Sequence, residues 1–189
     1  MDEHRIAEVS YARESLVAAL RDRGISYLAP SDAVAREVIE SHEQLLCALL
    51  QQHDSRLRLA IVPLLLLHPG ISASVFELVA RLDGVASLDL QTLYMAAVYL
   101  QRNWRSLLSI YLDDMTLLPD LFSQQMGLPL PEERFGKTGL VELADAWQAR
   151  SQYPFERLQA IYNTFELYRA AKAGESDPIE CAKDVIARA

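Results

Sequence analysis

Apolar residues recur along most of the chain at spacings of three and four, which places them on one face of a helix. The longest such stretch runs from Asp89 to Leu112, and it predicts one long central helix. Its apolar stripe consists of Leu93, Ala96, Leu100, Trp104, Leu107 and Tyr111. No segment shows the sustained alternation of apolar and polar residues that a half-buried strand has. The pattern therefore predicts an all-α protein.

Residues that begin and end helices divide the rest of the chain. The predicted helices cover 6–23, 32–52, 55–67 and 74–84 before the central helix, and 140–150, 154–173 and 178–189 after it. We thus expect an irregular helical bundle of about eight helices, folded as a single domain over residues 1–189.

Particular residues are expected to set these boundaries. Gly24 follows a basic last turn and should end the first helix, and Ser31 or Asp32 should cap the second. Pro63 should kink or break the third helix, because proline removes a backbone donor and clashes with the preceding turn. Ser74 and Glu77 have the spacing of a capping box for the fourth helix. That helix should end near Gly84.

The segment 127–139 differs from the rest of the chain. It contains two prolines and three glycines and cannot form a regular helix. Irregular segments of this length in compact domains often carry function. We predict a loop that lies across one end of the bundle, with Thr138 capping the helix that begins near Leu140.

Charge and composition limit the classes of partner. The chain has 189 residues, 51% of them hydrophobic, and a net charge of −8 from 26 acidic and 18 basic residues. Without a basic run it lacks the usual footprint for nucleic acid or for anionic lipid, so we expect neither as a partner. The longest apolar run, 57–67, is shorter than the roughly 20 residues of a membrane span. The N-terminus is charged and has no apolar core of a signal peptide, so a cytoplasmic location is expected.

Two acidic motifs are candidates for a metal site. His53-Asp54 is similar to the His-Asp pair that binds metal in helical HD-type phosphohydrolases. Those proteins also need an upstream histidine. Here that residue would be His42, eleven residues away; within one helix this is about 16 Å, too far for a shared ion. Asp113 and Asp114 could hold Mg²⁺ against a diphosphate, but the third aspartate of such motifs is missing. We expect Asp54 to cap a helix and the paired aspartates to be solvated in a turn.

A polar stretch inside the central helix is a candidate anion or partner site. Arg102 and Arg105 flank Trp104 and are three residues apart, so they could grip a carboxylate or a phosphate. The alternative is that Trp104 lies in the core while both arginines pair with acidic side chains. Phe135 and Lys137, in the irregular segment, are further candidate contacts for a partner.

The chain lacks a constellation for nucleophilic catalysis, and no cofactor is predicted. We expect a non-enzymatic protein-interaction or regulatory module, either a homodimer or a subunit of a larger complex. The physical reason is the amount of apolar surface, including 64–67 and 115–122, that a monomer would have to bury. The alternative is a metal-dependent phosphohydrolase-like or small-anion-binding helical enzyme using His53, Asp54, Asp113 and Asp114.

Overall fold

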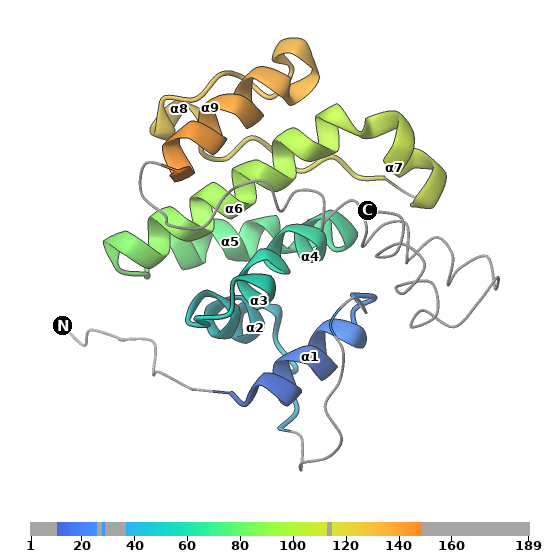
Figure 1. Ribbon diagram of the computed structural model, residues 1–189, viewed down its shortest axis with the longest axis vertical. Coiled ribbons are helices and arrows are strands. Elements are labelled where there is room, and N and C mark those ends of the chain that lie inside the picture. Colours follow the sequence, from blue (N-terminus) through green and yellow to red (C-terminus); the bar gives the residue numbers. More distant parts are fainter. Residues whose placement is uncertain (1–10, 26–27, 29–36, 113–114, 149–189) are drawn as a thin grey trace.

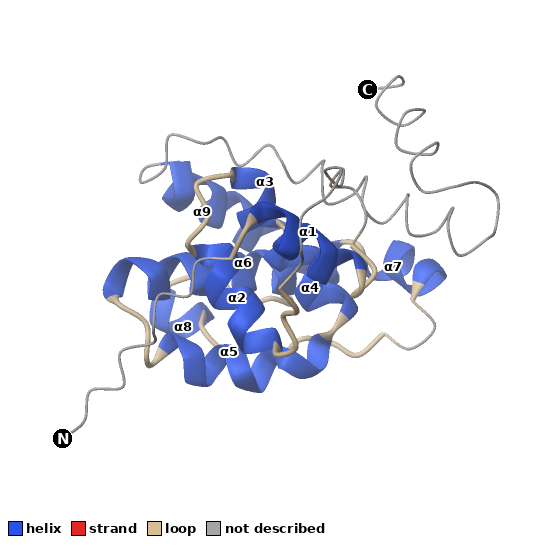
Figure 2. Ribbon diagram, turned by 90° about the horizontal axis from the view of Figure 1, so that it is seen from below, coloured by secondary structure: helices blue, strands red, loops and turns tan. Residues whose placement is uncertain are grey.

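The computed structural model describes residues 11–25, 28, 37–112 and 115–148, and every regular element within these ranges is helical (Figure 2). This confirms the all-α fold class. The elements in chain order are α1 (Arg13–Arg21), α2 (His42–Leu50), α3 (Ser55–Leu59), α4 (Ile61–Leu67), the 3-10 helix η1 (Pro69–Ile71), α5 (Ser72–Val79), α6 (Gly84–Asn103), α7 (Arg105–Tyr111), α8 (Ser123–Met126), the 3-10 helix η2 (Glu133–Gly136) and α9 (Lys137–Gln148).

Helix α6 is the centre of the molecule. It packs against α4 and α5 on one side and against η2 and α9 on another (Figure 1). Its residues 90–101 are all buried, as are Ile61–Leu66 of α4. The apolar side chains of α1, α2, α4, α5 and α6 join in one core. The leucine-rich stretch 64–67 is thus largely hidden within the molecule.

The central helix begins earlier and ends earlier than its apolar stripe predicts. Asp83 caps it, because its Oδ1 accepts hydrogen bonds from the backbone N–H groups of Val85 (3.0 Å) and Ala86 (2.9 Å). Gly84 is therefore the first residue of α6 and not the end of the preceding helix. At the other end Trp104 leaves the helical region, with φ −105° and ψ 21°. The prediction of one continuous helix over 89–112 is wrong at both ends.

The second helix also begins at a different cap. The Oγ of Ser41 accepts from the backbone N–H groups of Glu43 (3.2 Å) and Gln44 (3.5 Å), and residues 37–41 are not helical. The predicted helix over 32–52 is wrong at residues 37–41, and residues 32–36 lie outside the described ranges. Ser41 lies inside a stretch whose apolar residues match a helical period, so the sequence does not reveal its role as a cap.

Three boundaries agree with the sequence, and one does not. Asp54 caps α3 through a 2.8 Å bond from the Arg56 N–H, and a break at Ala60 separates α3 from α4, with Pro63 in the first turn of α4. Gly24 has φ +85°, and the chain turns there at the end of α1 as predicted. The capping box at Ser74 is not formed, because α5 already begins at Ser72.

Several predictions concern residues outside the described ranges. The helices expected over 154–173 and 178–189 lie there, as does the start of the first predicted helix. The division of residues 1–189 into a single domain therefore stays a prediction.

No single helix in the described part is long and apolar enough to cross a membrane. One strongly bent pair, Ser55–Leu67 with Pro69–Val79, passes the same test of length and composition. Its first half lies mostly in the core described above, which accounts for its apolar character.

Candidate functional site

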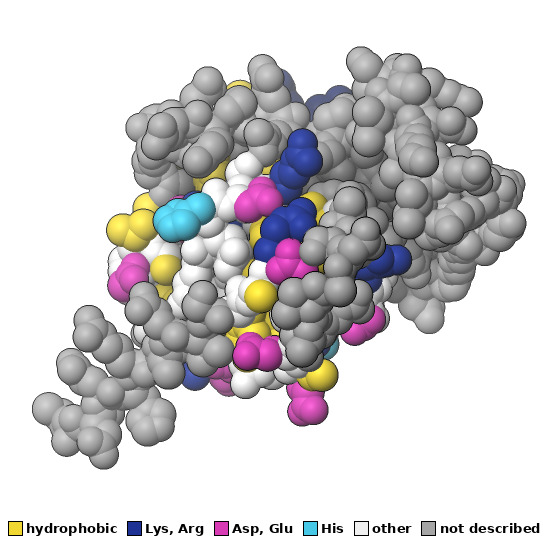
Figure 3. Space-filling view, turned by 60° about the horizontal axis from the view of Figure 1, so that its bottom comes forward, with side chains coloured by type: hydrophobic (Ala, Val, Ile, Leu, Met, Phe, Trp, Pro, Cys, Tyr) yellow, Lys and Arg dark blue, Asp and Glu magenta, His cyan; other side chains and the backbone are white. Residues whose placement is uncertain are grey.

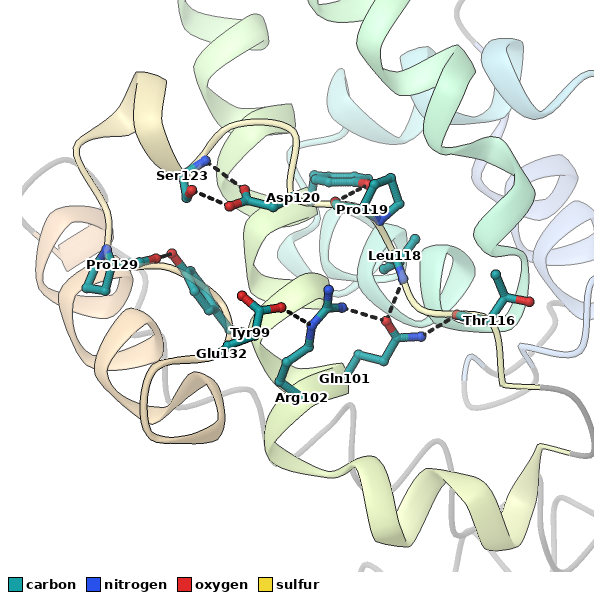
Figure 4. A network of polar contacts seen from close by, with 11 residues as sticks. Tyr99, Gln101, Arg102, Thr116, Leu118, Pro119, Asp120, Ser123, Pro129 and Glu132 are labelled. Atoms are coloured by element: carbon teal, nitrogen blue, oxygen red, sulfur yellow. Dashed lines mark hydrogen bonds and ion pairs between the residues drawn. The ribbon is translucent and has the colours of Figure 1, made fainter.

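Polar side chains on α6 hold an extended segment that follows α7. Gln101 is fully buried; its Nε2 donates to the carbonyl oxygen of Thr116 (2.8 Å), and its Oε1 accepts from the N–H of Leu118 (2.7 Å) (Figure 4). Farther back on α6, the Tyr94 hydroxyl donates to the carbonyl of Pro119 (2.9 Å). Leu118 is the buried residue of this segment, and without helix or sheet partners its backbone N–H must be satisfied in some other way. Here the side chains of one helix supply the partners.

The segment 127–139, which is predicted to be a loop, crosses closely over α6. The Tyr99 hydroxyl donates to the carbonyl of Pro129 (2.6 Å). A Cβ at Gly136 would lie 2.5 Å from the Tyr99 carbonyl oxygen, and one at Gly139 would lie 2.2 Å from its ring. Both positions therefore require glycine for close approach. The loop is also shorter than predicted, since α9 begins at Lys137 and Thr138 lies inside it.

The two tyrosines of α6 that bind these segments, Tyr94 and Tyr99, are held in their protonated form. Burial is the main cause that raises the pKa of Tyr94 and the pKa of Tyr99 well above the ordinary value of 10.0. The carboxylate of Asp120 raises both further, while the Arg102 guanidinium partly offsets the shift at Tyr94. Both hydroxyls thus remain donors to backbone carbonyls over the ordinary pH range.

Arg102 is used within this network. Its Nη1 donates to Gln101 Oε1 (3.1 Å), and its Nε lies 3.7 Å from Oε1 of Glu132, with only 12% of its side chain exposed. The break at Trp104 places Arg105, which is exposed, in a different helix. The continuous helix face assumed for the two arginines is therefore not formed. Trp104 itself is half-buried against the core.

Next to this network, η2 has an unusual backbone. Arg134 (φ 46°, ψ 37°) and Phe135 (φ 57°, ψ 43°) are both left-handed, and Gly136 follows with φ 78°. For a residue other than glycine this conformation costs about 1–2 kcal/mol. Gly136 is pressed against α6, while the Phe135 side chain is 76% exposed. This turn is thus energetically unfavourable, and it exposes an aromatic ring to solvent.

We call residues 130–141 the η2 region. It exposes two further apolar side chains, Leu130 (59%) and Val141 (61%). Its exposed charged residues carry both signs; they are Glu132, Glu133, Arg134 and Lys137. The sequence pointed to Phe135 and Lys137 here. It gave no sign of Leu130 or Val141, because an apolar residue beside a turn is as often buried as exposed.

Of the residues proposed as metal ligands, His53 and Asp54 lie within the described ranges. His53 is exposed between α2 and α3, and Asp54 is engaged as a cap and lies 3.9 Å from Arg13 Nε. Asp113 and Asp114 lie outside the described residues. Within the described ranges, no three His, Cys, Asp or Glu side chains gather so that they could hold a metal ion.

Other apolar side chains are exposed in the described part of the chain, among them Phe76 (57%) on α5 and Val85 (76%) on α6, but they do not lie on a left-handed backbone. Over the face formed by α1, α2 and α3, acidic and basic side chains are interspersed with small apolar areas (Figure 3). Comparison of the chain with protein-family models, curated proteins and solved structures found no significant match. The η2 region is therefore the candidate site on the strength of its own geometry.

Proposed function

We propose that the chain is a non-enzymatic protein-interaction module that binds a second copy of itself through the η2 region. The observation that carries this proposal is Phe135, which is 76% exposed on a left-handed backbone. Unfavourable backbone conformations persist where the surrounding structure enforces them, and they concentrate at functional positions.

The energetics favour an aromatic anchor at this position. Burying a phenylalanine side chain contributes about 1.5–3 kcal/mol, and a few such anchors supply most of the binding energy of an interface. The turn that carries Phe135 is also fixed beforehand, because Tyr99 binds Pro129 and Arg102 lies beside Glu132. A fixed turn loses little conformational entropy when a partner binds.

The mixture of charges supports a second copy as the partner. A two-fold interface brings the same surface of each protomer together, so that surface must complement itself. The η2 region offers Arg134 and Lys137 beside Glu132 and Glu133. In a symmetric pair the cations of one protomer can face the anions of the other, which favours correct pairing.

The test compares Phe135→Asn with the wild type by sedimentation velocity over a range of micromolar concentrations. Asparagine tolerates the left-handed conformation, so the variant removes the aromatic ring and keeps the turn. We expect a wild-type dimer and a dimer Kd at least about tenfold higher in the variant, equivalent to about 1.4 kcal/mol. The matched control is Val85→Asn, at an apolar side chain that is also 76% exposed but lies on the first turn of α6.

Two results would contradict the proposal. One is a wild-type protein that stays monomeric at the highest concentration. The other is an equal loss of association in Phe135→Asn and Val85→Asn. Far-ultraviolet circular dichroism of both variants checks that the helices are intact.

A further inference from the structure

The end of α1, the segment before α2 and the end of α4 meet around basic side chains. Arg23 donates from Nη1 to the carbonyl of Ala19 (2.8 Å) and from Nη2 to the carbonyls of Ile39 (2.9 Å) and Glu40 (2.9 Å). Its guanidinium thus fastens the turn after α1 to the segment that leads into α2.

Two histidines complete this junction. His68, directly after α4, has its Nε2 at 3.0 Å from the carbonyl oxygen of Arg23. A carbonyl oxygen can only accept, so Nε2 carries the proton and donates. His42 is the first residue of α2, and the centroids of the two imidazole rings are 5.6 Å apart. The junction therefore joins three helices through neighbouring titratable rings.

Burial, Arg23 and His68 all disfavour a positive charge on His42. Burial is the largest cause that lowers the pKa of His42 below the ordinary 6.5, followed by the charge of Arg23 and then by His68. The N-terminus of α2 adds its own positive end of the helix dipole. Of the nearby carboxylates, Glu43 pairs with Arg81, which follows α5, and Glu40 is exposed in the segment before α2.

We propose that His42, His68 and Arg23 form an acid-sensitive latch between α1, α2 and α4. When both rings are positively charged, three cations meet in one half-buried junction, and α1 separates from α2. This inference is independent of the proposed self-association, since none of these residues belongs to the η2 region.

The sign of the pH effect follows from the direction of the His42 shift. Below its ordinary pKa of 6.5, the opened junction takes up a proton that the closed junction binds less readily. The closed form is therefore favoured above this pH and loses stability as the pH falls through it.

Hydrogen exchange of the full-length protein at about pH 7.5 and about pH 5, on either side of the ordinary histidine pKa, tests the latch. After correction for the intrinsic pH dependence of exchange, we expect peptides covering 11–25 and 42–50 to exchange several-fold faster at the acid pH. Peptides within α6 should keep their protection. His68→Gln should abolish the acid effect, because glutamine can still donate to the Arg23 carbonyl but cannot become charged.

The matched control is His53→Gln, which changes an exposed histidine outside the junction and should leave the acid effect intact. A second readout is the ring-proton NMR titration of His42, whose pKa should move toward its ordinary value in His68→Gln. Equal acid sensitivity in His68→Gln and His53→Gln would overturn the latch, as would a His42 titration that His68→Gln leaves unchanged.

Discussion

At Gly139, α9 lies in close contact with α6. Gly139 is the third residue of α9, a position where glycine would ordinarily weaken a helix by about 1 kcal/mol relative to alanine. The close approach to the ring of Tyr99 explains why glycine stands there. Tyr99 cannot turn away freely, because its hydroxyl is bound to Pro129.

We expect Gly139→Ala to lower the free energy of unfolding by about 1–3 kcal/mol, the usual cost of overpacking a filled core. The measurement is urea denaturation followed by circular dichroism. Gly84→Ala is the control, since a Cβ at Gly84 meets nothing within 4 Å; its stability should stay the same or rise. A Gly139→Ala variant as stable as Gly84→Ala would show that the contact with Tyr99 is not restrictive.

At the scale of elements, the segment 115–121 depends on a neighbouring helix. It has no regular structure of its own, yet Leu118 is fully buried. Its N–H and the carbonyl of Thr116 are satisfied by one side chain, Gln101. A buried glutamine in the central helix thus supports the irregular segment that packs on that helix.

We expect Gln101→Leu to lower the free energy of unfolding by about 1–3 kcal/mol, because it leaves the buried N–H of Leu118 without its partner. The control is Gln91→Leu in the same helix. Gln91 is also buried, but its Nε2 only reaches the Ser87 Oγ at 3.4 Å. Equilibrium urea unfolding measures both variants. An equal loss at the two positions would contradict the role given to Gln101.

Local sequence predicts some of the helix boundaries and not others. Asp54, Gly24 and Pro63 act as their local sequence predicts. The starts of α2 and α6 do not follow from local sequence, because several residues before each helix could serve as a cap. Packing selects Ser41 and Asp83 among them.

At the scale of the whole molecule, the stability at alkaline pH depends on the two buried tyrosines of α6, Tyr94 and Tyr99. The pKa of Tyr94 and the pKa of Tyr99 are raised by burial. As the pH rises through the ordinary value of 10.0, these tyrosines release protons in the unfolded chain but keep them in the folded protein. Their contribution to stability is therefore complete below this pH and is lost above it.

We expect the urea midpoint of the wild type to fall between about pH 8 and pH 10.5, a range that spans the ordinary tyrosine pKa of about 10. The fall should be smaller in the double variant Tyr94→Phe with Tyr99→Phe. Tyr11→Phe is the control and should keep the full fall, because Tyr11 precedes α1 and does not belong to this network. If ultraviolet titration of the native protein showed every tyrosine ionising at its ordinary pKa, the assignment would be wrong.

The sequence by itself determined the helical fold class, because the spacing of apolar residues and the residues that cap helices are local properties. It also pointed to Phe135 and Lys137, because proline and glycine mark an irregular segment wherever they gather. Only the tertiary structure decided that Gln101 supports a segment beyond α7, that Gly139 touches Tyr99 and that Phe135 is left-handed and exposed. Each of these depends on contacts between elements distant in the chain, and periodicity within one element carries no information about them.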